Sequence, residues 1–165
     1  MTLRLTKILL VAAVAFLYTL IVFNNTTDYG SNYQFVHHVL LMYTTFPGNH
    51  GMWRAIHLPM VQAAFYDGII CWEALTMVLT WVGVAQLLRA LRKSAGDFNS
   101  AKRISIAALS LGMLLWFVAF ISVGGEWFLM YQSKIWSGQD AASRMFTVIG
   151  IVFVLLVLPD TETQP

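Results

Sequence analysis

The stretch ISIAALSLGMLLWFVAFISVGGEWFLMYQ, residues 104–132, decides the fold. It carries no charge before Glu126, and as a helix it is long enough to cross the ~30 Å hydrocarbon core of a bilayer. It closes with two glycines, one carboxylate and a group of aromatic and amide side chains, which are typical of a membrane boundary. The stretch therefore predicts a membrane-spanning helix at about residues 104–130.

The composition of the whole chain agrees with this prediction. Of its 165 residues, 58% are hydrophobic and 11% are charged. Soluble domains contain roughly 25% charged residues, so this chain cannot build a water-exposed surface over its whole area. Its basic residues are too few to indicate nucleic-acid binding, and the single Cys71 cannot form an intrachain disulfide. The class is a helical membrane protein, with the lipid bilayer as its first partner.

Three further apolar segments predict the remaining membrane spans, at about residues 5–23, 60–88 and 142–158. The span at residues 104–130 carries the small-residue pair Ala108 and Gly112, four residues apart, which would let a neighbouring helix approach closely. We therefore expect an all-α fold in which residues 1–165 form one four-span membrane domain.

The loop between the first two spans contains one more helical segment. Residues 33–46 are apolar enough to form a helix, with Ser31 and Gln34 in capping-box spacing and Pro47-Gly48 as a stop. Fourteen residues give a helix of ~21 Å, which is too short to span a bilayer. We expect a short interfacial helix at about residues 32–46 in the outer loop.

The basic residues predict the orientation of the chain. Seven of the ten flank the N-terminus or a predicted loop at residues 91–102: Arg4, Lys7, Arg89, Arg92, Lys93, Lys102 and Arg103. The positive-inside rule places this side in the cytoplasm, and with an even number of spans both termini are cytoplasmic. After Pro159, the sequence Asp160-Thr161-Glu162 is interpreted as a short acidic tail.

Two groups of polar residues are candidates for a functional site. On a helix, one group forms a stripe within about 80° on one face of the second span: Gln62, Tyr66, Glu73, Thr76 and Thr80. Glu73 is the most informative of these, because a carboxylate at that depth is costly and is a functional-site hypothesis by default. The other group lies at the outer ends of the helices: Glu126, Arg144, Arg54, His57 and Asp67.

Three interpretations of these residues compete. In a structural role, Glu126 pairs with Arg144 or Arg54, and Glu73 forms a hydrogen bond to another helix or a partner subunit. In a proton, ion or small-molecule path, Glu73 and Tyr66 act together with Glu126. In a haem or metal site, the four histidines supply ligands, although no HExxH motif and no Cys ligand set is present.

Two blocks of sequence resemble a known family. They are TTFPGN followed by WRAI, residues 44–49 and 53–56, and GGEWF-x-M-x-QS followed by W-x-GQ, residues 124–133 and 136–139, with Arg144 beyond. They are similar to a bacterial family of predicted small integral membrane proteins, a domain of unknown function. The resemblance covers nearly the whole chain and implies a four-span protein of the bacterial inner membrane, without naming a substrate.

The sequence favours a non-enzymatic accessory, assembly or structural membrane component. No nucleophile elbow, phosphate loop, CxxC pair or catalytic-triad spacing is present. We expect no catalytic residue, no bound metal and no cofactor, and either a partner membrane subunit or a homo-oligomer. The alternative is a protein that handles a small molecule, an ion or protons with its buried carboxylates, and a more distant one is a haem- or metal-binding redox subunit.

Overall fold

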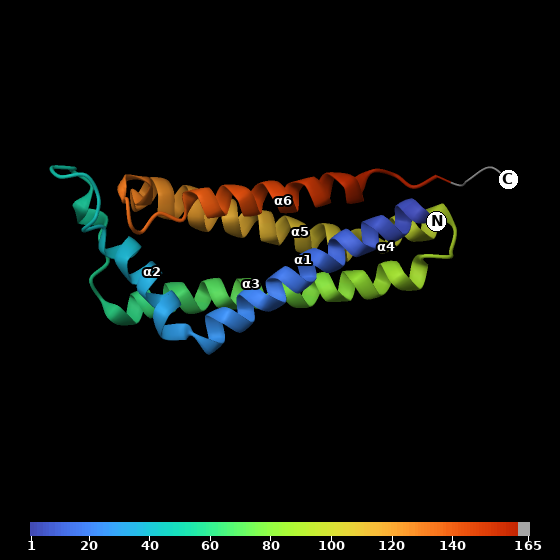
Figure 1. Ribbon diagram of the computed structural model, residues 1–165, viewed down its shortest axis with the longest axis horizontal. Helices are drawn as coiled ribbons and strands as arrows, with labels where there is room; N and C mark the ends of the chain where they lie inside the picture. The colour runs from blue at the N-terminus through green and yellow to red at the C-terminus, as the bar shows by residue number, and fades with distance from the viewer. Residues whose placement is uncertain (162–165) are drawn as a thin grey trace.

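The computed structural model describes residues 1–161, and over these residues the chain is helical without any strand. The predicted all-α class is confirmed. Four stretches are long and apolar enough to cross a membrane: α1 (Thr2–Thr27), α3 (Pro59–Ala90), the nearly continuous run Ala95–Trp127, and α6 (Gln139–Val157). They form an elongated bundle in which the N-terminus and the end of α6 lie at one end (Figure 1). We call this the terminal end and the opposite one the loop end.

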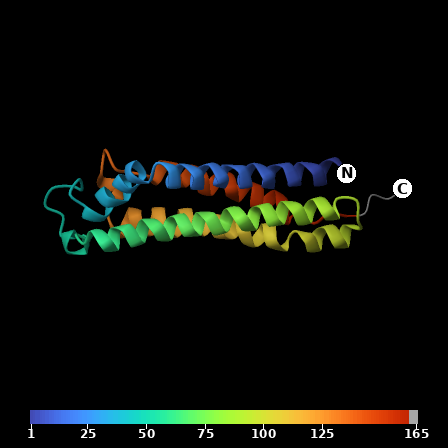
Figure 2. The same ribbon diagram turned by 90° about the horizontal axis from the view of Figure 1, so that it is seen from below.

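Packing in the bundle follows the order of the helices. Helix α1 packs along α3, and α3 packs along the third stretch, as the turned view in Figure 2 shows. Gly83 of α3 lies against the backbone of Ser105, so the two helices meet closely there. Gly112 lies against the ring of Tyr18, whose hydroxyl oxygen accepts a hydrogen bond of 3.0 Å from the indole N–H of Trp116. The small residues thus set the close helix contacts, as expected for membrane bundles.

The short helix α2 (Tyr29–Leu41) differs from its predicted form. It begins directly after α1, with the single residue Asp28 (φ −121°, ψ 49°) between the two helices, so the cap predicted at Ser31 is wrong and the helix starts before residue 32. The carbonyls of Asn24 and Asp28 accept backbone N–H groups at this bend, and the side-chain amide of Asn32 donates to both of them as well. The helix ends at Leu41, where Met42 adopts a left-handed conformation (φ 57°).

The predicted loop at residues 91–102 is also shorter than expected. Helix α4 (Ala95–Ala101) occupies most of it, because Ser94 caps this helix by accepting a 3.1 Å bond from the Asp97 N–H. Helix α5 (Arg103–Leu114) follows and continues as η2 (Leu115–Trp127), a π-helix in which Phe128 N–H donates to the Val123 carbonyl five residues back. Two single-turn 3₁₀ helices, η1 (Met52–Arg54) and η3 (Met130–Gln132), lie in the loops at the loop end.

Candidate functional site

The polar stripe predicted on the second span faces the interior of the bundle. All five of its residues are buried: Gln62, Tyr66, Glu73, Thr76 and Thr80. The two threonines donate to backbone carbonyls four residues back in α3, Thr76 to Trp72 at 2.9 Å and Thr80 to Thr76 at 2.6 Å. Their hydroxyls are therefore satisfied within the helix, which leaves three members of the stripe to contact other elements.

Gln62 joins three elements at the loop end. Its amide nitrogen donates to the Ile56 carbonyl at 2.6 Å, and its Oε1 accepts from the Tyr33 hydroxyl at 3.1 Å. The His37 Nδ1 lies 2.7 Å from the same Oε1, so His37 presents a protonated Nδ1 there. This residue ties the start of α3 to α2 and to the preceding loop, and every polar atom of its side chain has a partner.

Glu73 contacts the end of α1. Its Oε2 accepts a 2.7 Å hydrogen bond from the side-chain amide of Asn25, and the Tyr66 hydroxyl lies 3.3 Å from the Oδ1 of Asn25. Glu73 is 2% exposed, and it borders a cavity of about 200 Å³ together with Asn25, Asn32 and Tyr66. Within residues 1–161, no hydrogen-bond partner is present for its other oxygen, Oε1. The stripe therefore contains one carboxylate oxygen, on a buried residue, that is free to bind something else.

The structure does not bring the predicted outer-end residues together. The guanidinium of Arg54 donates to the Trp127 carbonyl at 3.2 Å and lies over the rings of Trp53 and Trp127. Asp67 accepts a 2.8 Å bond from the Tyr29 hydroxyl, which raises the pKa of Tyr29. His57, Glu126 and Arg144 are exposed. Among residues 1–161 no ion pair within 4.0 Å involves Glu126, because Gly124 and Gly125 face inward and turn Glu126 outward.

The separation of Glu126 from Arg144 leads to a prediction. Glu126→Gln and Arg144→Gln are expected to change stability by less than about 0.5 kcal/mol each, as is usual for exposed positions. Because no contact couples them, their effects should add in the double variant, within about 0.5 kcal/mol. Thermal unfolding of the two single variants and the double variant checks this. A coupling larger than 1 kcal/mol would show that the two side chains pair in the membrane.

The histidines lie near the loop end but are not arranged as one ligand set. His38 contacts the Tyr43 hydroxyl and stacks on Trp136 with ring centroids 4.2 Å apart, and burial together with the nearby His37 lowers the pKa of His38. In the described part of the chain, no three His, Cys, Asp or Glu side chains converge as a group that could hold a metal ion. Aromatic contacts and the hydrogen bond to Gln62 account for the two histidines of α2.

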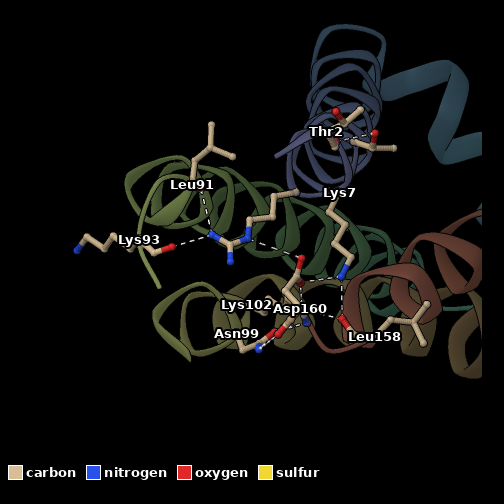
Figure 3. A network of polar contacts seen from close by, with 10 residues as sticks. Thr2, Lys7, Leu91, Lys93, Asn99, Lys102, Leu158 and Asp160 are labelled. Carbon is tan, nitrogen blue, oxygen red and sulfur yellow. Dashed lines mark hydrogen bonds and ion pairs between the residues drawn. The ribbon is translucent and has the colours of Figure 1, made fainter. Parts of the chain in front are cut away.

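A cluster at the terminal end was not predicted from the sequence. Asp160 does not extend into solvent as part of an acidic tail; it is 8% exposed and lies between three basic side chains (Figure 3). Its carboxylate is 2.7 Å from the Lys7 ammonium, 2.5 Å from that of Lys102, and 3.9 Å from the Arg4 guanidinium. Glu162, the other acid of the predicted tail, lies outside the described residues.

We call this group the Asp160 cluster; its members are Arg4, Lys7, Asn99, Lys102 and Asp160. Hydrogen bonds to the backbone complete it. Both ammonium groups donate to the Leu158 carbonyl, and Asn99 bonds to the backbone of Asp160 through both its amide nitrogen and its oxygen. Arg4 also donates to the carbonyls of Leu91 and Lys93. Although burial raises the pKa of Asp160, the bonds from Lys102 and Lys7 outweigh it and the net pKa is lowered. The cluster thus joins α1, the 91–94 loop, α4 and the end of α6.

The sequence contained a signal for this cluster. The predicted topology already placed Asp160 on the same side of the membrane as Arg4, Lys7 and Lys102, and it follows Pro159, which ends the last helix. One acid beside several cations at a helix end is a candidate for an ion pair. The same basic residues also indicate topology, and that interpretation alone does not predict their ion pairs with Asp160.

The family of this chain follows from a comparison with known families. The family described as predicted small integral membrane protein (DUF2165) matches residues 3–159. The chain belongs to this family. A search of curated proteins and a search of solved structures each found no significant match. The protein is therefore a small, multi-pass integral membrane protein, and the description of its family carries no substrate.

In this family member, the two polar centres differ in what they can do. The Asp160 cluster pairs its buried carboxylate with cations on both sides, so it can hold helices together. The Glu73 centre pairs its carboxylate with one neutral amide and borders a cavity, so it can also accept a ligand group.

Proposed function

We propose that the protein is a non-enzymatic accessory or assembly component of the bacterial inner membrane, with residues 1–165 as one four-span domain and both termini in the cytoplasm. The orientation is supported by the seven basic residues of the N-terminus and the 89–103 region, which belong to the terminal end of the bundle. A non-enzymatic role as an accessory or assembly component is supported by the polar stripe, because most of its hydrogen bonds hold α1, α2 and α3 together.

The observation that carries this proposal is the outward face of α6. Of the most apolar 18 residues in this helix 22% are buried, compared with 28% in α3 and 33% in the other two spans. Exposed Ser143 and Thr147 lie one turn apart on this face. In membranes, small and hydroxyl side chains at this spacing are typical of helix–helix interfaces. We propose that this face binds a helix of a partner subunit or of a second copy.

Native extraction into polymer-bounded nanodiscs tests the proposal. The unmodified chain of 18.6 kDa should be recovered together with a second membrane chain, or with a copy of itself, at a fixed ratio measured by native mass spectrometry. Thr147→Trp should release that chain, because a large side chain separates the helices. Leu20→Trp, on an exposed face of α1, is the matched control and should retain it. Single chains in the unmodified sample, or retention in Thr147→Trp, would overturn the proposal.

An alternative function in handling a small molecule, an ion or protons is favoured by one observation, the free Oε1 of Glu73 beside a cavity. Tyr66, the other residue of the second span in such a path, borders the same cavity. Glu126 does not border it and is exposed instead.

A further inference from the structure

We infer that the cavity at Glu73 binds the cationic head of a small amphipathic amine, whose apolar part lies in the adjoining pocket between α2, α3 and η2. This site is independent of the α6 face and of any partner bound there. Three features of the cavity favour such a ligand: its free acceptor atoms, the charge of its lining, and the apolar spaces beside it.

The free polar atoms in the cavity wall are acceptors. Glu73 Oε1 has no partner within residues 1–161, and neither has the Oδ1 of Asn32, whose amide nitrogen is already used at the bend between α1 and α2. Each side-chain donor group of the wall already has an acceptor, since the Asn25 amide donates to Glu73, the Tyr66 hydroxyl to Asn25 and the Trp116 indole to Tyr18. A ligand that satisfies this cavity must therefore donate hydrogen bonds.

The charge of the cavity favours a cation among such donors. Its ten lining residues include one acid, Glu73, and no basic residue. Burial makes the ionised carboxylate of Glu73 costly, and Asn25 supplies only a neutral N–H donor, so an opposite charge is the partner that would stabilise it. A protonated amine supplies both the missing charge and several N–H donors. A neutral alcohol would supply the donor alone, and an anion would be repelled.

The spaces around the cavity specify the rest of the ligand. A second pocket of about 200 Å³, with an apolar lining, shares Phe35, Val36, Ile69 and Phe120 with the Glu73 cavity. It also shares Phe65, Ile69 and Ala119 with an apolar groove along α3 and η2. Together the two pockets reach the lower part of the 300–1,000 Å³ range of small-molecule sites. An amphipathic ligand can therefore approach from the hydrocarbon side and place its head at Glu73.

Three probes that share one apolar skeleton test the inference: 4-phenylbutylamine, 4-phenylbutanol and 4-phenylbutyrate. Their affinities are measured by equilibrium dialysis against protein in nanodiscs, with empty nanodiscs subtracted. On the unmodified protein, the amine should bind at least tenfold more tightly than the alcohol, and the anion should not bind. This comparison needs no variant. Equal binding of amine and alcohol, or no binding of the amine, would overturn the inference.

Two variants then locate the site. Glu73→Gln keeps an acceptor for Asn25 and removes the charge, so it should weaken amine binding at least tenfold and change alcohol binding less than threefold. Asp67→Asn removes an exposed carboxylate from the same helix and is the matched control, with no expected change. Ala119→Phe fills the apolar groove and should weaken both the amine and the alcohol. Amine binding that is unchanged in a folded Glu73→Gln variant would place the probe elsewhere and refute the site.

Discussion

Asp160→Asn should destabilise the bundle by roughly 2–3 kcal/mol. Removing one partner of a fully buried ion pair costs roughly 3–5 kcal/mol, because the other charge remains buried and unpaired. Here Lys7 and Lys102 are 3% and 2% exposed, and both lose their only carboxylate within residues 1–161. The expected destabilisation is smaller than the cost of a fully unpaired buried charge, because both ammonium groups keep the Leu158 carbonyl as an acceptor. Thermal unfolding in mild detergent should show a midpoint lowered on the order of 5–10 °C.

The control for this substitution is Asp140→Asn, at the other end of α6. Asp140 is exposed in the first turn of that helix, where its charge contributes less than about 1 kcal/mol. An equal loss in both variants would mean that the Asp160 cluster does not stabilise the bundle.

The same cluster predicts how stability depends on pH. The pKa of Asp160 is lowered in the folded chain, so its contribution is fully present above the unfolded value of about 3.9. It is lost as the pH falls through the lowered folded pKa. Between pH 7 and 5, Asp160→Asn should therefore lower the unfolding midpoint by a constant amount, and the difference should narrow only below about pH 4.

Gly83→Ala should destabilise the chain by roughly 1–3 kcal/mol, the usual cost of overpacking a close contact. A Cβ atom at position 83 would lie 3.0 Å from both the Cα and the backbone nitrogen of Ser105. Backbone atoms cannot turn away as a flexible side chain can, so α3 and α5 must separate. The chain should unfold at a lower temperature, and the larger Gly83→Leu substitution should reduce the yield of folded protein as well.

Gly68→Ala provides a matched control within the same helix. No atom lies within 4 Å of a Cβ at that position, so the substitution adds helix propensity without a clash. Its expected effect is neutral or slightly stabilising. If both alanine variants had the same unfolding midpoint, the close contact between α3 and α5 would not exist in the membrane-embedded protein.

The sequence predicted the elements whose signal is local and long. Each span is an uninterrupted apolar segment, and the stripe from Gln62 to Thr80 follows from helical periodicity alone. Residue spacing also indicated the close contact at Gly112. These features depend on the solvent preference of many neighbouring residues, so one misjudged position does not change them.

The features that the sequence did not predict depend on single residues or on distant partners. The bend at Asp28 is one residue wide, and the α4 cap at Ser94 lay in a segment whose charges suggested only a loop. The π-helical geometry of η2 changes no side-chain type, so composition cannot indicate it. In the Asp160 cluster, Lys7 and Asp160 are more than 150 positions apart in the sequence, and only the packed bundle brings them together.

The order of Lys7, Lys102 and Asp160 along the chain has a consequence for biogenesis. Lys7 leaves the ribosome first, Lys102 follows 95 residues later, and Asp160 follows another 58 residues after that. Until Asp160 has been made, both ammonium groups lie in a partly inserted chain without their counter-ion. The terminal end of the bundle can close only after Asp160 has been made, so a chain that stops before this residue leaves both ammonium groups without their carboxylate.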